Sequence, residues 1–187
     1  MRAGRPGGMG LAAFLLFGGA SRGQDSLNVT KVGEVAFWDM AEAIVVSSNL
    51  AYLAAGESGL RIVDITNPAS PIEVGFCDIA GVALNIALWN SYALVVMQSY
   101  DLIIIDITDP TSPFEVGYYD NPAFSSSTTD NAGVAAQGNY AYLPSGSDGL
   151  RVVDLDNPAL PLELAQCPIE YARELALAGN LVYVAGG

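Results

Sequence analysis

The side chains able to carry chemistry in this chain are mainly carboxylates. Asp and Glu number 20 against 7 for Lys and Arg, histidine is absent, and the formal charge is −13. Without histidine the chain lacks the usual general base at neutral pH and any Ser-His-Asp or Cys-His arrangement. Carboxylates alone still permit a Ca²⁺ site or a two-acid glycoside hydrolase site. The acidic balance argues against nucleic acid as a partner, because cations on phosphates supply most of that affinity.

One candidate ligand-binding site surrounds a long Ser/Thr-rich stretch, residues 121–131 (NPAFSSSTTDN). Loops on a rigid scaffold often carry function. We therefore expect ligand contacts from Phe124, from Asp120 and Asp130 at the ends of the stretch, and from Arg173 and Glu174 on a neighbouring connection. The alternative is a solvated insertion, since surface loops tolerate extra length. Neither a D-x-D-x-D-G calcium loop nor a distinct pair of acids stands out. We predict no catalytic residue, no metal site and no cofactor, with Ca²⁺ as a weaker alternative.

Three aspartates recur in closely similar phrases. GLRIVDITNPASPIEVG (59–75), DLIIIDITDPTSPFEVG (101–117) and GLRVVDLDNPALPLELA (149–165) place them 42 and 48 residues apart, at Asp64, Asp106 and Asp154. In each phrase Asn or Asp then precedes a proline that presets φ for a turn, at Pro68, Pro110 and Pro158. We predict that the repeated aspartates are framework, hydrogen-bonded to amides of the turns or of neighbouring blades. The alternative is a ring of metal-binding aspartates.

The elements that must position these residues are short strands. A period of 40 to 50 residues, with four apolar runs per unit separated by turn residues, is typical of a β-propeller. The run LIIIDI (102–107) does not alternate apolar and polar residues, so neighbouring sheets should cover both its faces. We predict an all-β fold of four-stranded antiparallel blades, at about 43–78, 84–120 and 132–168, with partial blades at 29–39 and 173–187.

We expect this β-propeller to be incomplete. Propellers close with about 4 to 8 blades. Here 29–39 matches only the last strand of a preceding unit, and 173–187 matches only the first two strands of another. Truncation of a larger propeller is the favoured explanation, and self-association that covers the open edges is the alternative.

The repeated phrases resemble the LVIVD repeat family. The resemblance is carried by Tyr140–Tyr142, Gly149–Asp154, Asn157–Pro161 and LIIID at 102–106, and it covers about residues 29–187. It implies β-propeller-like repeats found in exported and cell-surface proteins. No characterised catalytic motif comes with the family, so the resemblance implies a fold and a location but no reaction.

The N-terminus is typical of an export signal. Arg2 and Arg5 precede the apolar run Leu11–Phe17, and small residues follow it. The run is too short to span a bilayer, and no cysteine for a lipid anchor comes after it. We predict a signal peptide at 1–23, a secreted, periplasmic or cell-surface location, and no transmembrane segment after its removal.

Cysteines, arginines and tryptophans also occupy informative positions. Cys77 and Cys167 match in blades that are not neighbours, which predicts no bridge between them and burial as small apolar residues. Pairing with missing parts or with another molecule stays open. Arg61 and Arg151 also match, with Ile103 between them, which predicts packing along a blade edge with the charged heads in water. For the tryptophans at 38 and 89, core packing is favoured over a sugar site.

Taken together, these features predict a non-catalytic exported repeat protein that acts as a binding or adhesion scaffold. Its partner is expected to be an extracellular protein or a glycan. The alternative is a carbohydrate-active hydrolase or lyase that uses carboxylates on the loop face. On that face the residues named above are joined by Asp39, Glu42, Asp78 and Glu170.

Overall fold

The computed structural model describes residues 32–35, 40–98, 102–120 and 133–187, and every regular element in them is a strand. The first sheet holds β1 (Ala43–Ser47), β2 (Leu50–Ala54), β3 (Leu60–Asp64) and β4 (Ile72–Cys77). The second holds β5 (Ala83–Trp89), β6 (Tyr92–Met97), β7 (Leu102–Asp106) and β8 (Phe114–Tyr119). The third holds β9 (Ala135–Gln137), β10 (Tyr140–Pro144), β11 (Leu150–Asp154) and β12 (Leu162–Cys167). A two-stranded sheet, β13 (Glu174–Ala178) and β14 (Leu181–Ala185), follows.

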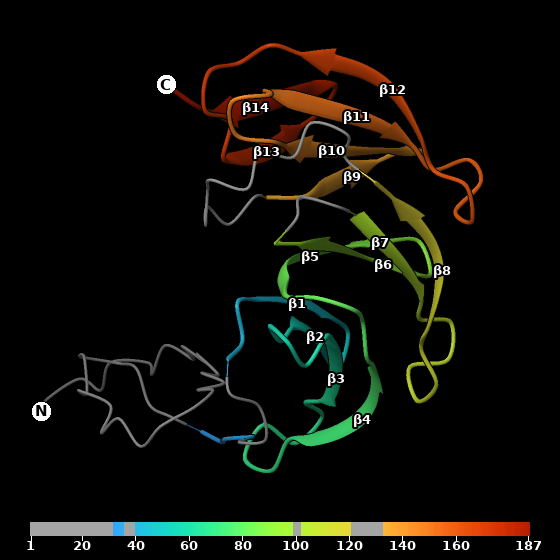
Figure 1. Cartoon of the computed structure of the whole chain (residues 1–187). Helices are drawn as coiled ribbons and strands as arrows, with labels where there is room; N and C mark the ends of the chain where they lie inside the picture. The colour runs from blue at the N-terminus through green and yellow to red at the C-terminus, as the bar shows by residue number, and fades with distance from the viewer. Residues whose placement is uncertain (1–31, 36–39, 99–101, 121–132) are drawn as a thin grey trace, which may run out of the picture.

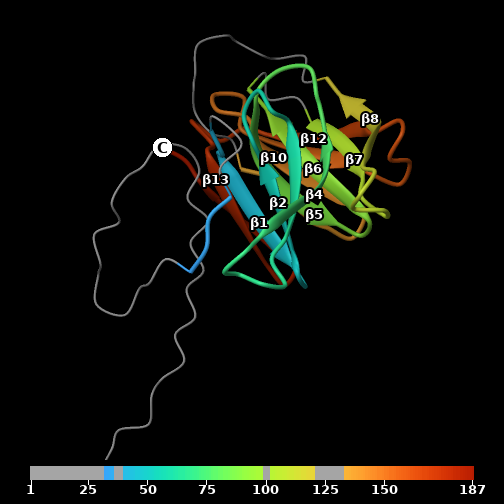
Figure 2. The ribbon, with the colours of Figure 1, turned by 90° about the horizontal axis from the view of Figure 1, so that it is seen from below.

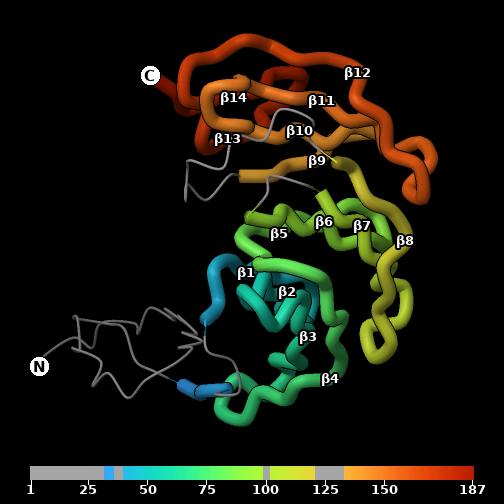
Figure 3. The backbone as a smooth tube through the Cα atoms, viewed as in Figure 1, coloured from blue at the N-terminus to red at the C-terminus, as the bar shows by residue number. Residues whose placement is uncertain are grey.

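Each sheet is an antiparallel meander whose strands lie in chain order. The sheets follow one another face to face in an arc (Figures 1 and 2). Strands β4, β8 and β12 lie along the outer side, and the first strand of each sheet lies toward the inner side (Figure 3). The predicted all-β propeller of four-stranded blades is confirmed, and within the described residues its ring is not closed.

The core lies between successive sheets, and β7 shows why its sequence does not alternate. Ile103 and Ile105 pack toward the first sheet, whereas Leu102 and Ile104 pack toward the third. All four are buried. Burial of one such side chain contributes about 1.5–3 kcal/mol. The expectation that both faces of this strand are covered is confirmed.

A glycine ties the outer strands β4 and β8 to the proline turns of the second and third sheets. A Cβ atom placed on Gly75 would lie 2.0 Å from the carbonyl oxygen of Pro110, and one on Gly117 would lie 1.9 Å from that of Pro158. Gly33 meets Pro68 in the same way at 2.0 Å, although residues 32–35 form no strand. The rest of the strand predicted at 29–39 lies outside the described residues. The turns therefore dock where only glycine leaves room.

Side-chain donors link successive sheets at the turns after their first strands. Trp89 Nε1 donates to the carbonyl oxygen of Gly138 at 2.6 Å, and Gln137 Nε2 donates to that of Gly179 at 2.8 Å. Trp89 is buried and stacks on Tyr92, so its predicted core role is confirmed. The tryptophan at 38 lies outside the described residues.

The predicted signal peptide, residues 1–23, also lies outside the described residues. Within those residues no helix has the length and apolar character needed to cross a membrane.

Candidate functional site

The sheets have two ends with different contents. One end carries the loops that connect successive sheets and the hairpin loops β2–β3 and β10–β11. We call it the connection end. The opposite end, which carries the proline turns after β3, β7 and β11, we call the turn end. The repeated aspartates lie at the turn end, and the predicted ligand residues that the structure describes, Asp120, Arg173 and Glu174, lie at the connection end.

Each repeated aspartate accepts a hydrogen bond from the backbone two residues further on. The amide of Thr66 donates to Asp64 Oδ1 at 2.7 Å, and the amide of Thr108 donates to Asp106 Oδ1 at 2.8 Å. The amide of Asp156 donates to Asp154 Oδ1 at 2.8 Å. Hydrogen bonds from the side chain and the backbone of Thr66 hold the pKa of Asp64 below its ordinary value. Turn amides thus occupy the same carboxylate oxygen in all three repeats.

A second such turn follows at once in each repeat. Asn67, Asp109 and Asn157 accept from the amides two residues on, at 3.2, 2.9 and 3.2 Å. Hydrogen bonds from the Thr111 side chain and backbone also lower the pKa of Asp109. These paired turns present Pro68, Pro110 and Pro158 to the glycines described above. Asp64, Asp106, Asp109 and Asp154 therefore stabilise the turns of the repeated phrase.

Arg173 and Glu174 meet one end of the long connection in space. The amide of Gly133 donates to the carbonyl oxygen of Arg173 at 3.0 Å, and a Cβ atom on Gly133 would lie 2.9 Å from Glu174 Oε2. Arg173, Glu174 and Asp120 are all exposed. Phe124 and Asp130 lie outside the described residues. The structure thus brings the start of β13 to Gly133, which follows the Ser/Thr-rich stretch in the sequence.

The described carboxylates of the connection end do not gather into a metal site. Among the described residues, no group of three or more Asp, Glu or Cys side chains lies close enough to hold a metal ion. Asp78 is instead paired with Arg61, whose Nη2 donates to its Oδ1 at 2.9 Å. A Ca²⁺ site that uses Asp39 or Asp130 would involve residues outside the described part of the chain.

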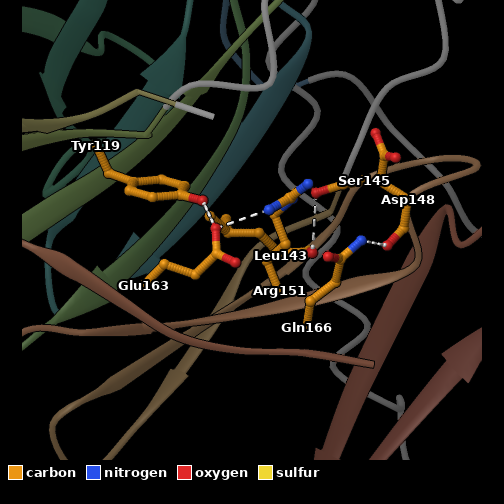
Figure 4. Close-up of polar contacts among 7 residues, drawn as sticks. All are labelled: Tyr119, Leu143, Ser145, Asp148, Arg151, Glu163 and Gln166. Carbon is orange, nitrogen blue, oxygen red and sulfur yellow. Dashed lines mark hydrogen bonds and ion pairs between the residues drawn. The ribbon is translucent and has the colours of Figure 1, made fainter. Parts of the chain in front are cut away.

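A polar cluster that the sequence analysis missed joins the second and third sheets (Figure 4). Arg151 on β11 is only 3% exposed, and its Nη1 lies 2.7 Å from Glu163 Oε2 on β12. The hydroxyl group of Tyr119 on β8 donates a hydrogen bond to the same carboxylate oxygen. Burial, and then the hydrogen bond to Glu163, raise the pKa of Tyr119 above its ordinary value. The cluster is a charge-assisted link between two blades.

The predicted exposure of the arginine heads is wrong for Arg151, because its guanidinium is enclosed between two sheets. Arg61 is partly enclosed as well. Its guanidinium carbon lies 4.7 Å from the centre of the Phe76 ring, and its Nη1 lies 3.7 Å from Glu73 Oε1. In both repeats a glutamate follows the arginine by 12 residues. That shared spacing was the available signal for an ion pair.

Cys77 and Cys167 are not bonded to each other, as predicted, but they are less buried than expected. Cys77 is half-buried against the core between the first two sheets, and burial is the main cause of its raised pKa. Cys167 is exposed, so its predicted burial is wrong. Tyr119 holds the matching position on β8 and fills the space toward the third sheet.

Comparisons with known proteins agree with this architecture. The model of the LVIVD repeat matches three stretches of the chain, residues 40–79, 80–121 and 130–168. No curated protein matches the chain in sequence. Among solved structures, the computationally designed protein Ika8 is similar with a TM-score of 0.60 and 11% identity, over 78% of this chain and 42% of that one. BamB from Moraxella catarrhalis, a β-propeller, is similar with a TM-score of 0.60 and 11% identity, over 78% of this chain and 43% of that one. The chain thus spans about two fifths of either structure, and at this identity the likeness concerns the fold alone.

Proposed function

The chain belongs to the LVIVD repeat family, and from that premise we propose that it is an exported, non-catalytic scaffold that binds an extracellular protein or a glycan. Export is supported by the order of charged, apolar and small residues over the first 20 positions. We propose that the ligand binds at the connection end, around the residues that connect β8 to β9.

One observation carries the non-catalytic part of this proposal. The repeated acids Asp64, Asp106 and Asp154 each accept a backbone amide of their own turn. The two arginines that match between repeats also form ion pairs within the chain, Arg61 with Glu73 and Asp78, and Arg151 with Glu163. Polar residues that form such hydrogen bonds and ion pairs stabilise the fold. We therefore assign recognition to the loop positions, which differ between the repeats.

The loop residues form the proposed ligand-binding surface. Arg173 and Glu174 are exposed beside Gly133, at the end of the stretch that contains Phe124 and Asp130. An aromatic ring with an arginine and nearby carboxylates suits a glycan hydroxyl array or a polar protein surface. A Ca²⁺ ion coordinated by Asp120 and Asp130 would be a variant of the same site.

The experiment is a glycan array and a pull-down of extracellular proteins with the purified chain, followed by affinity measurements on single variants. Phe124→Ala and Arg173→Ala should each lower the affinity for the captured ligand by about tenfold. A loss of this size is typical of residues at the centre of an interface. The matched control is Asp156→Asn, because Asp156 lies at the turn end and should leave the affinity unchanged. Equal affinities for all three variants would refute the proposed location.

The carbohydrate-active alternative is tested on the same material. A hydrolase or lyase would turn over one of the captured glycans, and Asp120→Asn or Glu174→Gln would abolish that turnover. We predict that the chain binds the glycan without hydrolysing or cleaving it. Release of sugar that depends on either carboxylate would overturn the non-catalytic assignment.

A further inference from the structure

Large apolar side chains are exposed at both ends of the arc of sheets. The two-stranded sheet β13–β14 lies at one end, and the first sheet lies at the other (Figure 1). Exposure alternates along β14, where Leu181 and Tyr183 are 58% and 56% exposed; we call this side the β14 face. On β1, Ile44 and Val46 are 47% and 54% exposed; we call this side the β1 face. Exposed apolar surface of this kind often marks a contact with another protein.

The β14 face repeats a face that is buried elsewhere in the chain. The residues that match on the two strands are identical: Leu50, Tyr52 and Ala54 on β2, and Leu181, Tyr183 and Ala185 on β14. On β2 these residues pack against the second sheet, where Tyr52 is only 6% exposed. The hairpins also agree, because Leu50 pairs with Ser47 and Leu181 pairs with Ala178 across turns of equal length. The β14 face therefore has the side chains that this fold packs on a following sheet.

The β1 face likewise matches the receiving side of an existing contact. The strand registers place Ile44 and Val46 where the second sheet has Ile86 and Leu88. Ile86 is buried in the core between the first two sheets, and Leu88 packs against that core. A contact between the β14 face and the β1 face would therefore repeat, between two chains, the packing of the first sheet on the second.

Only the inner part of the first sheet is exposed on this side. Leu53 and Val63 on the same side are buried in a cluster that includes a residue of the segment 32–35. That segment holds the place of an outer strand, because Gly33 docks against Pro68 as described above. The exposed part thus lies where the inner strands of a preceding sheet would pack. Strands β13 and β14 match β1 and β2, which are the inner strands of a sheet.

The backbone holds the sheet β13–β14 in the position of a blade. The amides of Gly146 and Ala172 each donate to the carbonyl oxygen of the other residue at 2.9 Å. Gly56 and Ala83 make the same pair of hydrogen bonds between the first two sheets, at 3.2 and 2.9 Å. The β14 face is thus fixed before any partner arrives, and a preformed surface lowers the entropy cost of association.

We infer that two copies of this chain associate head to tail, with the β14 face of each copy packed on the β1 face of the other. The curvature of the arc suits this number, because the likeness to BamB covers 43% of that β-propeller, so two arcs correspond to most of one ring. A head-to-tail contact that closes after two copies gives a dimer and not a filament. This inference goes beyond the proposed ligand binding and does not depend on it.

The charge of the chain predicts how the dimer responds to salt. Each copy carries a formal charge of −13, so two copies repel each other at long range. The exposed residues that define the two faces are uncharged, and their contact is favoured by the burial of apolar surface. Salt screens the repulsion, because the Debye length falls from about 10 Å at 0.1 M to about 3 Å at 1 M. The dimer should therefore become tighter at higher salt.

Analytical ultracentrifugation of the full chain measures the association. We expect a mass of 19.5 kDa at low concentration and twice that mass at high concentration, with a Kd below about 100 μM. Val46→Lys and Tyr183→Glu should each raise this Kd by at least about a hundredfold, because each substitution alters both contacts of the dimer. Both residues are exposed, so circular dichroism should show an unchanged fold. The controls Leu160→Lys and Leu160→Glu place the same charges on an exposed residue of the turn end and should not change the Kd.

An equimolar mixture of Val46→Lys and Tyr183→Glu tests the head-to-tail arrangement itself. In the mixed dimer, one contact joins two unaltered faces, and the other brings the introduced lysine against the introduced glutamate. The Kd of the mixture should therefore return to within about tenfold of the wild-type value. A dimer built on one face alone would be disrupted by only one of the two variants, which would overturn the inference.

Other results would also contradict this assembly. These are a wild-type chain that stays monomeric at about 100 μM, a mixture that shows no recovery, oligomers that keep growing with concentration, and association that weakens between 0.1 and 1 M salt. A monomeric chain that still binds its ligand through Phe124 and Arg173 would lose this inference and leave the proposed function standing.

Discussion

Replacement of Gly117 by alanine tests the contact that holds successive sheets together. The backbone of Gly117 lies outside the left-handed region, so alanine meets no conformational barrier there. On entropy alone, Gly→Ala in a strand would stabilise the fold by roughly 0.5–1 kcal/mol. The only obstacle is steric, which makes the sign of the change informative.

The magnitude follows from the distances around the missing methyl group. Its carbon would lie 1.9 Å from the carbonyl oxygen of Pro158 and 3.0 Å from the Cα of Ala159, and real Cβ atoms essentially never approach closer than 3.0 Å. The turn must therefore retreat by roughly 1 Å, and both obstructing atoms belong to backbone. Overpacking of this kind costs about 1–3 kcal/mol. We predict that Gly117→Ala lowers the free energy of unfolding by about 2 kcal/mol, which corresponds to a Tm decrease of roughly 4–8 °C.

Urea and thermal unfolding, followed by circular dichroism and tryptophan fluorescence, measure the change. Gly75→Ala should behave like Gly117→Ala, because its Cβ would meet Pro110 in the same way. The matched control is Ala165→Gly, since Ala165 holds the same position on β12 but is exposed. That change should cost only about 0.5–1 kcal/mol, by chain entropy. A Gly117→Ala protein as stable as the wild type, or more stable, would refute the docking argument.

Three further predictions concern the polar framework. Glu163→Ala leaves the enclosed Arg151 without its partner and should cost roughly 3 kcal/mol in urea unfolding. The control is Glu115→Ala, because Glu115 matches Glu163 in a repeat that has Ile103 at the position of Arg151, and it should change stability by less than about 0.5 kcal/mol. Equal losses would contradict the ion-pair argument. Because the pKa of Tyr119 is raised in the fold, its contribution to stability is full below the unfolded pKa of 10.0 and falls as the pH rises above it. Wild-type stability should therefore decline above pH 10 more steeply than that of Tyr119→Phe, as measured by urea midpoints, and parallel curves would contradict this assignment. The lowered pKa values of Asp64 and Asp109 have the opposite effect: their stabilisation is present above the ordinary value of 3.8 and is lost as the pH falls below it. In Thr66→Val and Thr111→Val, the free energy of unfolding should fall less steeply than in the wild type as the pH drops below 3.8. An unchanged pH dependence would show that the threonines do not act on these carboxylates.

Much of the fold could be predicted because its signals are local and repeated. The run from Leu102 to Asp106 lacks alternation, which indicated a strand covered on both faces, and the prolines marked where strands end. Asparagine and aspartate before proline predicted the turns whose hydrogen bonds are now seen. Each of these inferences depends on a few neighbouring residues and on one steric or hydrogen-bonding rule.

The contacts between sheets were harder to predict, because they depend on residues more than forty positions apart. Nothing near Gly117 indicates that the carbonyl of Pro158 will occupy the place of a side chain. Likewise Ile103, at the position that matches Arg151, suggested an edge residue, whereas Tyr119 of the preceding sheet encloses the guanidinium. Cys167 was expected in the core by analogy with Cys77 and is exposed. Of the candidate ligand residues, the described ones lie near the long connection, and their role stays a prediction.

The most direct test of the account is hydrogen exchange, measured by NMR, at the amides of Thr66, Thr108 and Asp156 in metal-free buffer. These amides lie in exposed turns and donate to Asp64, Asp106 and Asp154. If the repeated aspartates are framework, all three amides should be protected without any added metal, to a degree close to that of the strands they follow. Exchange at the rate of an unstructured chain that slows only when Ca²⁺ is added would show instead that the aspartates serve a metal site.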